Sequence, residues 1–143
     1  PFLRSIIINK GSKHKIKLGM VVMDGAYLVG KVVEVNYLSS RVLLLSDLNS
    51  KIPVIIEPNS VFSILSGTGK DYGIIQYSKK YEDIKNESVI YTSGVGSLFK
   101  TGIPIGRMNT NNSSDEKKVE FFSDFSQLKF VKVVSYKKSE NKW

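Results

Sequence analysis

Apolar residues occur along this chain in short clusters that are rich in β-branched and aromatic side chains and are separated by Gly, Pro, Asn and Asp. This pattern is typical of all-β domains. No stretch keeps helical periodicity over three turns, and only residues 124–129 favour a short helical turn, with Asp124 as its cap. Many short strands without crossover helices indicate antiparallel sandwiches or barrels.

The same clusters give the expected strands. Between residues 33 and 37 apolar and polar residues alternate, as in a strand with one wet face, whereas 41–46 does not alternate and is predicted to be buried on both faces. The predicted strands are 5–8, 20–23, 28–37, 41–45, 52–57, 61–65, 72–77, 88–91, 103–108, 119–123 and 130–136.

A weak internal repeat bears on the number of units. Residues 16–32 are echoed by 84–108, and each copy reads as a turn, a strand, a glycine turn, and a strand whose interior glycine, Gly30 or Gly106, precedes a basic residue. This similarity is consistent with either a duplication or the sequence preferences common to β proteins. In both cases the strand glycines are expected to mark bulges or barrel corners.

The length of 143 residues, with 41% hydrophobic, suits one ordinary domain or two very small ones. We predict an all-β fold of two small antiparallel six-stranded β-barrels packed side by side. Residues 1–50 would form the first barrel subdomain, which later strands can complete, and 51–136 the second. The polar stretch 109–118 is expected to be a loop and 137–143 a flexible tail.

Composition removes several classes of site. The chain has no cysteine and one histidine, which excludes disulfides, thiolate metal sites and any site built on several imidazoles. A formal charge of +8 invites anionic partners such as nucleic acid, a membrane surface or an acidic polymer. No apolar run approaches the roughly 20 residues that cross a bilayer. Because the chain begins with Pro rather than Met, we expect a fragment of a longer protein.

Two glycine-containing motifs suggest enzyme sites. The segment 66–71 resembles a phosphate-binding loop, but Ile64 and Asp71 stand where a glycine and a magnesium-binding hydroxyl are needed, which favours a plain glycine turn. Ser93 lies next to a glycine, and two-barrel serine proteases are all-β proteins.

The alternative function is therefore a trypsin-like two-barrel serine hydrolase with Ser93, His14 and either Asp24 or Asp47. It requires Ser93 and His14 to lie within hydrogen-bonding reach. Tyr91 breaks the nucleophile-elbow pattern, and the basic neighbours of His14 favour a solvated turn instead.

A second alternative is a basic nucleic-acid-binding β-barrel. Lysines and aromatic residues are interleaved in 77–81 and 129–138, as in sites that stack bases beside a phosphate backbone. In the second segment, however, strand alternation leaves neither face purely basic or aromatic. This function predicts affinity that falls steeply with salt.

A series of short motifs also runs in a fixed order from about residue 6 to 135. They are Ile7–Ser12, Gly19–Val22 with Asp24 and Gly25, Leu28–Val32, Ser40–Asp47, Ile52–Val54, Gly67–Gly69, Val89–Gly94, Phe99 with Gly102–Gly106, and Phe125–Leu128. The ordered set resembles the extracytoplasmic β-domain of the MreC family of rod shape-determining proteins. Asn86, Glu87 and Lys100 depart from the family pattern at turns.

The resemblance implies a non-catalytic scaffold of bacterial cell-wall elongation. Members of this family bind a class B penicillin-binding protein, work with MreB, MreD and the rod-shape glycosyltransferase, and self-associate into dimers or filaments. It also implies a missing N-terminal part with a membrane anchor, and a place on the extracytoplasmic side of the cytoplasmic membrane. It brings no catalytic residue, cofactor, metal or nucleic-acid partner.

A scaffold of this kind binds through apolar anchors on rigid surfaces rather than through a deep pocket. The inserted turn 95–101 carries Leu98 and Phe99, Tyr27 lies at the equivalent turn of the first unit, and Tyr37 closes a strand. These four residues are the predicted partner-binding positions. The competing explanation for each is packing in the core or within the turn.

Overall fold

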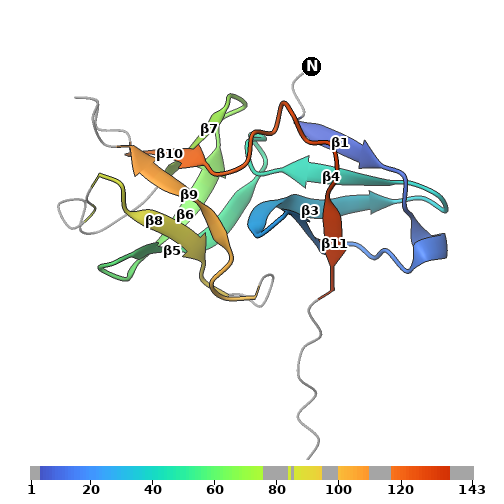
Figure 1. Cartoon of the computed structure of the whole chain (residues 1–143), viewed down its shortest axis with the longest axis horizontal. Coiled ribbons are helices and arrows are strands. Elements are labelled where there is room, and N and C mark those ends of the chain that lie inside the picture. The colour runs from blue at the N-terminus through green and yellow to red at the C-terminus, as the bar shows by residue number, and fades with distance from the viewer. Residues whose placement is uncertain (1–3, 76–83, 85, 95–99, 110–116, 136–143) are drawn as a thin grey trace, which may run out of the picture.

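The computed structural model of the chain describes residues 4–75, 84, 86–94, 100–109 and 117–135. Within these residues it is an all-β protein with one short 3-10 helix, η1 (Figure 1). Each of the eleven predicted segments overlaps a strand, although the ends of the 72–77 and 130–136 segments, the tail 137–143 and most of the loop 109–118 lie outside the described residues. The elements are β1 (Ser5–Ile8), η1 (Ser12–His14), β2 (Val21–Asp24), β3 (Tyr27–Val35), β4 (Ser40–Leu44), β5 (Lys51–Glu57), β6 (Val61–Gly67), β7 (Tyr72–Ile75), β8 (Val89–Thr92), β9 (Pro104–Asn109), β10 (Lys117–Phe121) and β11 (Lys132–Val134).

The strands form two units that lie side by side in Figure 1. One is a closed six-stranded barrel in the order β10-β7-β6-β5-β8-β9, which we call the barrel. The other, which we call the first sheet, has five strands in the order β1-β4-β3-β2-β11. The prediction of two six-stranded barrels therefore needs correction for this unit. Its hairpins supply four strands, and the fifth, β11, returns from the far end of the chain to pair with β2.

Both faces of the first sheet are apolar, and they belong to different cores. Val21, Met23 and Leu28 join the large core that fills the barrel, whereas Val22 belongs to a separate small cluster. Successive strand residues point to opposite faces, so an unbroken apolar run in β2 serves both cores. The two units are thus joined by a common hydrophobic core rather than by a linker.

The strand glycines occupy equivalent places in the two units. Gly30 pairs with Val22 beside a bulge in the β2–β3 ladder, and Gly106 pairs with Ile90 beside a bulge in the β8–β9 ladder. A Cβ atom on Gly30 would lie 2.0 Å from the Leu43 carbonyl oxygen of β4, and one on Gly106 would lie 2.2 Å from the Glu120 carbonyl oxygen of β10. The predicted bulges are confirmed, and the shared geometry favours duplication as the origin of the repeat.

Two local predictions are corrected. Residues 124–129 contain a single turn, closed by the Gln127 N–H donating to the Asp124 carbonyl at 3.1 Å, and not a helix. Asp124 does cap this turn, because its Oδ1 accepts hydrogen bonds from the Ser126 N–H at 3.0 Å and the Ser126 hydroxyl at 2.6 Å. The same bonds hold the pKa of Asp124 below its ordinary value. In β4 alternate residues are buried, and Arg41 forms a half-exposed ion pair with Glu34 at 2.9 Å, so one face of this strand meets water.

Candidate partner-binding surface

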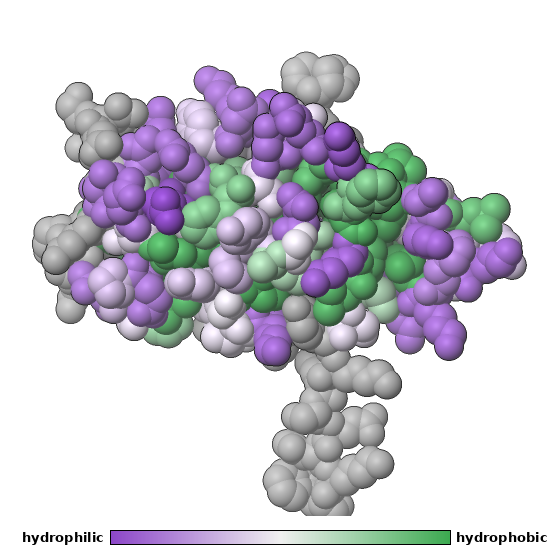
Figure 2. Space-filling model, viewed as in Figure 1, coloured by the Kyte–Doolittle hydropathy of each residue, from purple (hydrophilic) through white to green (hydrophobic). Residues whose placement is uncertain are grey.

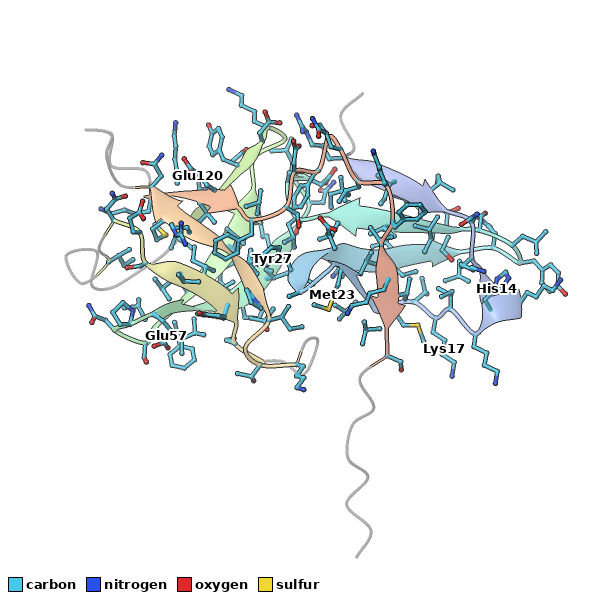
Figure 3. The ribbon with its side chains drawn as sticks, viewed as in Figure 1. His14, Lys17, Met23, Tyr27, Glu57 and Glu120 are labelled. Carbon is cyan, nitrogen blue, oxygen red and sulfur yellow. The ribbon has the colours of Figure 1, made fainter. Side chains whose placement is uncertain are left out.

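Tyr27 lies where the first sheet meets the barrel (Figure 3). It begins β3 after a tight turn in which Gly25 has a φ of 58°, a conformation that glycine adopts without strain. Tyr27 is 39% exposed, and its ring packs against Phe122 with ring centroids 5.0 Å apart. The Arg107 guanidinium lies 5.4 Å from the Phe122 ring centroid. Tyr27 therefore contributes to packing between the units and also presents one edge to solvent.

Tyr37 lies in the turn between β3 and β4, and it is 65% exposed next to Leu38, which is 56% exposed. The backbone of this turn is fixed by η1: the Ser12 N–H donates to the Asn36 carbonyl at 2.9 Å and the Lys13 N–H to the Tyr37 carbonyl at 3.0 Å. An exposed aromatic and an exposed leucine are thus held on a rigid turn, as a partner-binding anchor requires.

Leu98 and Phe99 lie outside the described residues, so their predicted role stays a prediction. The structure does show exposed apolar residues that the sequence reasoning missed. On the barrel these are Phe62 and Ile64, which alternate along β6, and on the first sheet they include Ile7 and Phe130. Figure 2 shows hydrophobic surface over the first sheet between hydrophilic regions. Alternate residues of β6 must point to opposite faces, but the sequence does not show which of the two sets faces solvent.

The structure does not assemble the hydrolase triad. His14 lies in η1 at the far end of the first sheet (Figure 3), whereas Ser93 follows β8 of the barrel, where its N–H donates to the Pro53 carbonyl of β5 at 3.3 Å. Asp47 is buried, and its carboxylate accepts hydrogen bonds from the backbone N–H groups of Arg4 and Asn49. This carboxylate fixes the chain at the start of β1 and is not available to orient an imidazole.

The glycine segment 66–71 is the predicted turn, between β6 and β7. Gly69 has a φ of 77°, its N–H donates to the Ser46 carbonyl at 2.7 Å, and its carbonyl accepts from Arg4 Nε at 2.8 Å. Because these backbone groups are bonded within the protein, the segment does not form an open nest for phosphate.

Of the two basic segments, only part of 129–138 lies within the described residues, so their convergence on one surface stays a prediction. Lys118 lies over the Tyr72 ring, with Nζ 4.6 Å from the centroid, on the barrel, whereas Lys129 and Phe130 precede β11 of the first sheet. Residues 77–81 lie outside the described part of the chain. Within that part, no three acidic or histidine side chains cluster as metal ligands would. No helix among the described residues has the length and hydropathy needed to span a membrane.

Together these features define a β-domain whose candidate functional surface includes the exposed pair Tyr37 and Leu38 on a rigid turn. The family model described as "Rod shape-determining protein MreC, barrel core" matches residues 1–135. The chain therefore belongs to the MreC family of rod shape-determining proteins, as its ordered motifs predicted.

Known relatives agree with this assignment. The cell shape-determining protein MreC of Caulobacter vibrioides is 31% identical over 137 residues, which is 96% of this chain and 39% of the relative. The chain spans less than half the length of the curated relatives it matches. The crystal structure of MreC from Pseudomonas aeruginosa superposes with a TM-score of 0.85 at 29% identity, covering 94% of this chain and 91% of that one.

Two more distant structures share the fold. The major periplasmic domain of the cell shape-determining filament MreC has a TM-score of 0.72 at 24% identity, covering 87% of this chain and 81% of that one. A chain from the complex between penicillin-binding protein PBP2 and MreC of Helicobacter pylori has a TM-score of 0.57 at 16% identity, covering 71% of this chain and 64% of that one. At these identities the likeness is one of fold.

Proposed function

We propose that this chain is the extracytoplasmic β-domain of a non-catalytic scaffold for bacterial cell-wall elongation, which maintains rod shape by binding a class B penicillin-binding protein. The match to the MreC family over residues 1–135 carries the proposal. An MreC chain of the same fold in complex with PBP2 supports the choice of partner. The rival hydrolase mechanism is disfavoured, because His14 lies in η1 at the far end of the first sheet, whereas Ser93 follows β8 of the barrel.

The contact surface that we assign includes Tyr27 and Tyr37, with Leu98 and Phe99 from the inserted turn. Tyr37 is the strongest of these positions because it is well exposed while its backbone is held by η1. A side chain on a fixed turn loses little further backbone entropy when a partner covers it. Tyr27 is half-exposed and packed on Phe122, so it would contribute contact area on one edge only.

Other parts of the scaffold role follow from the family. We assign MreB, MreD and the rod-shape glycosyltransferase as further members of the complex, and self-association into a dimer or filament. An N-terminal segment outside this chain would anchor the domain at the membrane. The net charge of +8 then suits a surface that faces anionic lipid headgroups or acidic partner proteins.

A pull-down with a purified class B transpeptidase, paired with light scattering for self-association, tests this function. Tyr37→Ala should weaken transpeptidase binding by about tenfold or more, because aromatic anchors dominate such interfaces. Phe62→Ala is the matched control, since Phe62 is a similarly exposed aromatic residue at 62% exposure on the barrel. If both Tyr27→Ala and Leu98→Ala leave transpeptidase binding and self-association unchanged, the assignment of this contact surface is wrong.

A further inference from the structure

A groove with a volume of about 920 Å³ lies between the two edge strands of the first sheet. One wall is β1 with the residues that follow it, through Lys10, and the other is the segment 125–131 together with Val133 of β11. These two edges are the ends of the five-stranded order, so the sheet curls far enough for its first and last strands to line the same space. In Figure 1 the chain before β11 runs beside β1.

The barrel indicates what belongs in this space. The equivalent glycines match β2, β3 and β4 of the first sheet to β8, β9 and β10 of the barrel. Beyond them, β1 pairs with β4 as β7 pairs with β10, and β11 pairs with β2 as β5 pairs with β8. The strand of the barrel left without a counterpart is β6, which lies between β7 and β5. Its place in the first sheet is the groove between β1 and β11.

Strand directions are consistent with an insertion there. All pairs in both units are antiparallel, and β6 runs antiparallel to both of its neighbours. Alternation around the first sheet gives β1 and β11 the same direction, because three antiparallel strands separate them. One added strand can therefore run antiparallel to both edges at once, as β6 does in the barrel.

The edge of β1 has backbone groups available for such a strand. The Leu44 N–H donates to the Arg4 carbonyl at 3.0 Å, which sets the hydrogen-bonding phase of the β1–β4 ladder. In an antiparallel pair the phase alternates, so the N–H and C=O groups of Ser5 and Ile7 point away from β4. Among the described strands β1 pairs with β4 alone. Ile7 is also 66% exposed.

The small core of the first sheet is incompletely covered on this side. It contains three buried residues, and the residues packed around it from the two edges are only partly buried. They include Ile6 and Ile8 from β1 and Val131 and Val133 from the β11 side. An added strand would cover these side chains with its own inward-facing apolar residues.

Charge distinguishes between possible occupants. The groove lining carries the positive charges of Lys10 and Lys129 and includes no carboxylate. A second copy of this chain would bring another net charge of +8 and the same basic edge. Charge complementarity therefore selects a strand that carries carboxylates.

We propose that the groove between β1 and β11 binds an extended strand of a partner protein, apolar on the side that faces the small core and acidic on the other, by β-addition antiparallel to β1. The bound strand completes the first sheet to six strands and takes the place that β6 has in the barrel. This inference does not depend on the transpeptidase contact proposed above, because it rests on strand pairing at a different surface from Tyr37.

The test uses a fluorescein-labelled six-residue peptide of alternating valine and glutamate, titrated with this chain while fluorescence anisotropy is measured. Two matched peptides are compared with it: one has lysine in place of glutamate, and one has N-methyl groups on the backbone nitrogens that would face β1. Ile7→Pro removes an outward N–H without removing a bond to β4, and Ile7→Val keeps that N–H. Thermal unfolding shows whether each variant is folded.

The valine–glutamate peptide should bind saturably, at least tenfold more tightly than the lysine or N-methyl peptides. Ile7→Pro should weaken binding at least tenfold, while Ile7→Val should leave it within about twofold. If Ile7→Pro is unfolded, the N-methyl peptide tests the same backbone contact on wild-type protein. Equal binding of the N-methylated and parent peptides, or no saturable binding, would overturn the proposal. A wild-type dimer that becomes monomeric in Ile7→Pro would also overturn it, because the occupant would then be a second copy. Retained transpeptidase capture by Ile7→Pro would separate this site from the proposed function.

Discussion

Replacing Leu28 by Ala tests whether the two units share one core. Leu28 belongs to the first sheet, yet its fully buried side chain lies in the same cluster as the barrel residues. Truncating a buried leucine costs about 2–5 kcal/mol through lost transfer energy and the cavity left behind. For a chain of this length, we expect a decrease of roughly 10 °C in the unfolding midpoint. Because the core is common, the whole molecule should still unfold in one cooperative transition at the lower temperature.

Calorimetry combined with urea unfolding checks this result. Leu18→Ala is the matched control, because Leu18 is 68% exposed and its truncation should change the free energy of unfolding by less than about 0.5 kcal/mol. The reasoning is refuted if wild type unfolds in two steps. It is also refuted if Leu28→Ala melts one unit and leaves a transition at the original temperature.

Three further variants address single structural features. Gly106→Ala should destabilise the barrel by more than 1 kcal/mol in urea unfolding, because its Cβ would lie 2.2 Å from a backbone carbonyl oxygen of β10; an unchanged midpoint would contradict that close approach. Thr92→Val should cost about 1–3 kcal/mol in the same assay, because the buried hydroxyl accepts from the Ile103 N–H at 2.9 Å and donates to a carbonyl that would both lose their partner. Asp124→Asn should have a lower melting temperature than wild type at neutral pH, and this difference should vanish as pH falls below about 4. Ser126 stabilises the ionised carboxylate, so its folded-state pKa is lowered and its contribution disappears on protonation; a difference in melting temperature that persists at pH 2 would argue against this.

Most of the secondary structure could be predicted because local sequence determines it. Short β-branched runs between turn residues located each strand among the described residues, and the interior glycines correctly located the bulges beside Gly30 and Gly106. Gly30 and Gly106 are informative because each lies against a backbone carbonyl, where no other residue fits. The same local signals predicted the glycine turn between β6 and β7 correctly.

Strand order and surface contacts could not be predicted, since they depend on residues far apart in the chain. The sequence of β11 does not indicate that it pairs with β2, and this pairing supplies the fifth strand of the first sheet. The packing of Tyr27 on Phe122 joins segments nearly a hundred positions apart. At Asp124 the local signal was ambiguous, because aspartate favours both helix caps and side-chain-bonded turns.

Photo-crosslinking in cells tests the central claim, that this domain binds a class B penicillin-binding protein through exposed anchors on rigid turns. A photoreactive phenylalanine analogue is placed at Tyr37 in the full-length protein and, as a control, at Phe62, and the adducts are identified by mass spectrometry. We predict an adduct with a class B penicillin-binding protein from position 37 and none from position 62. Adducts with that protein from position 62 alone, or from neither position in rod-shaped cells, would contradict the account.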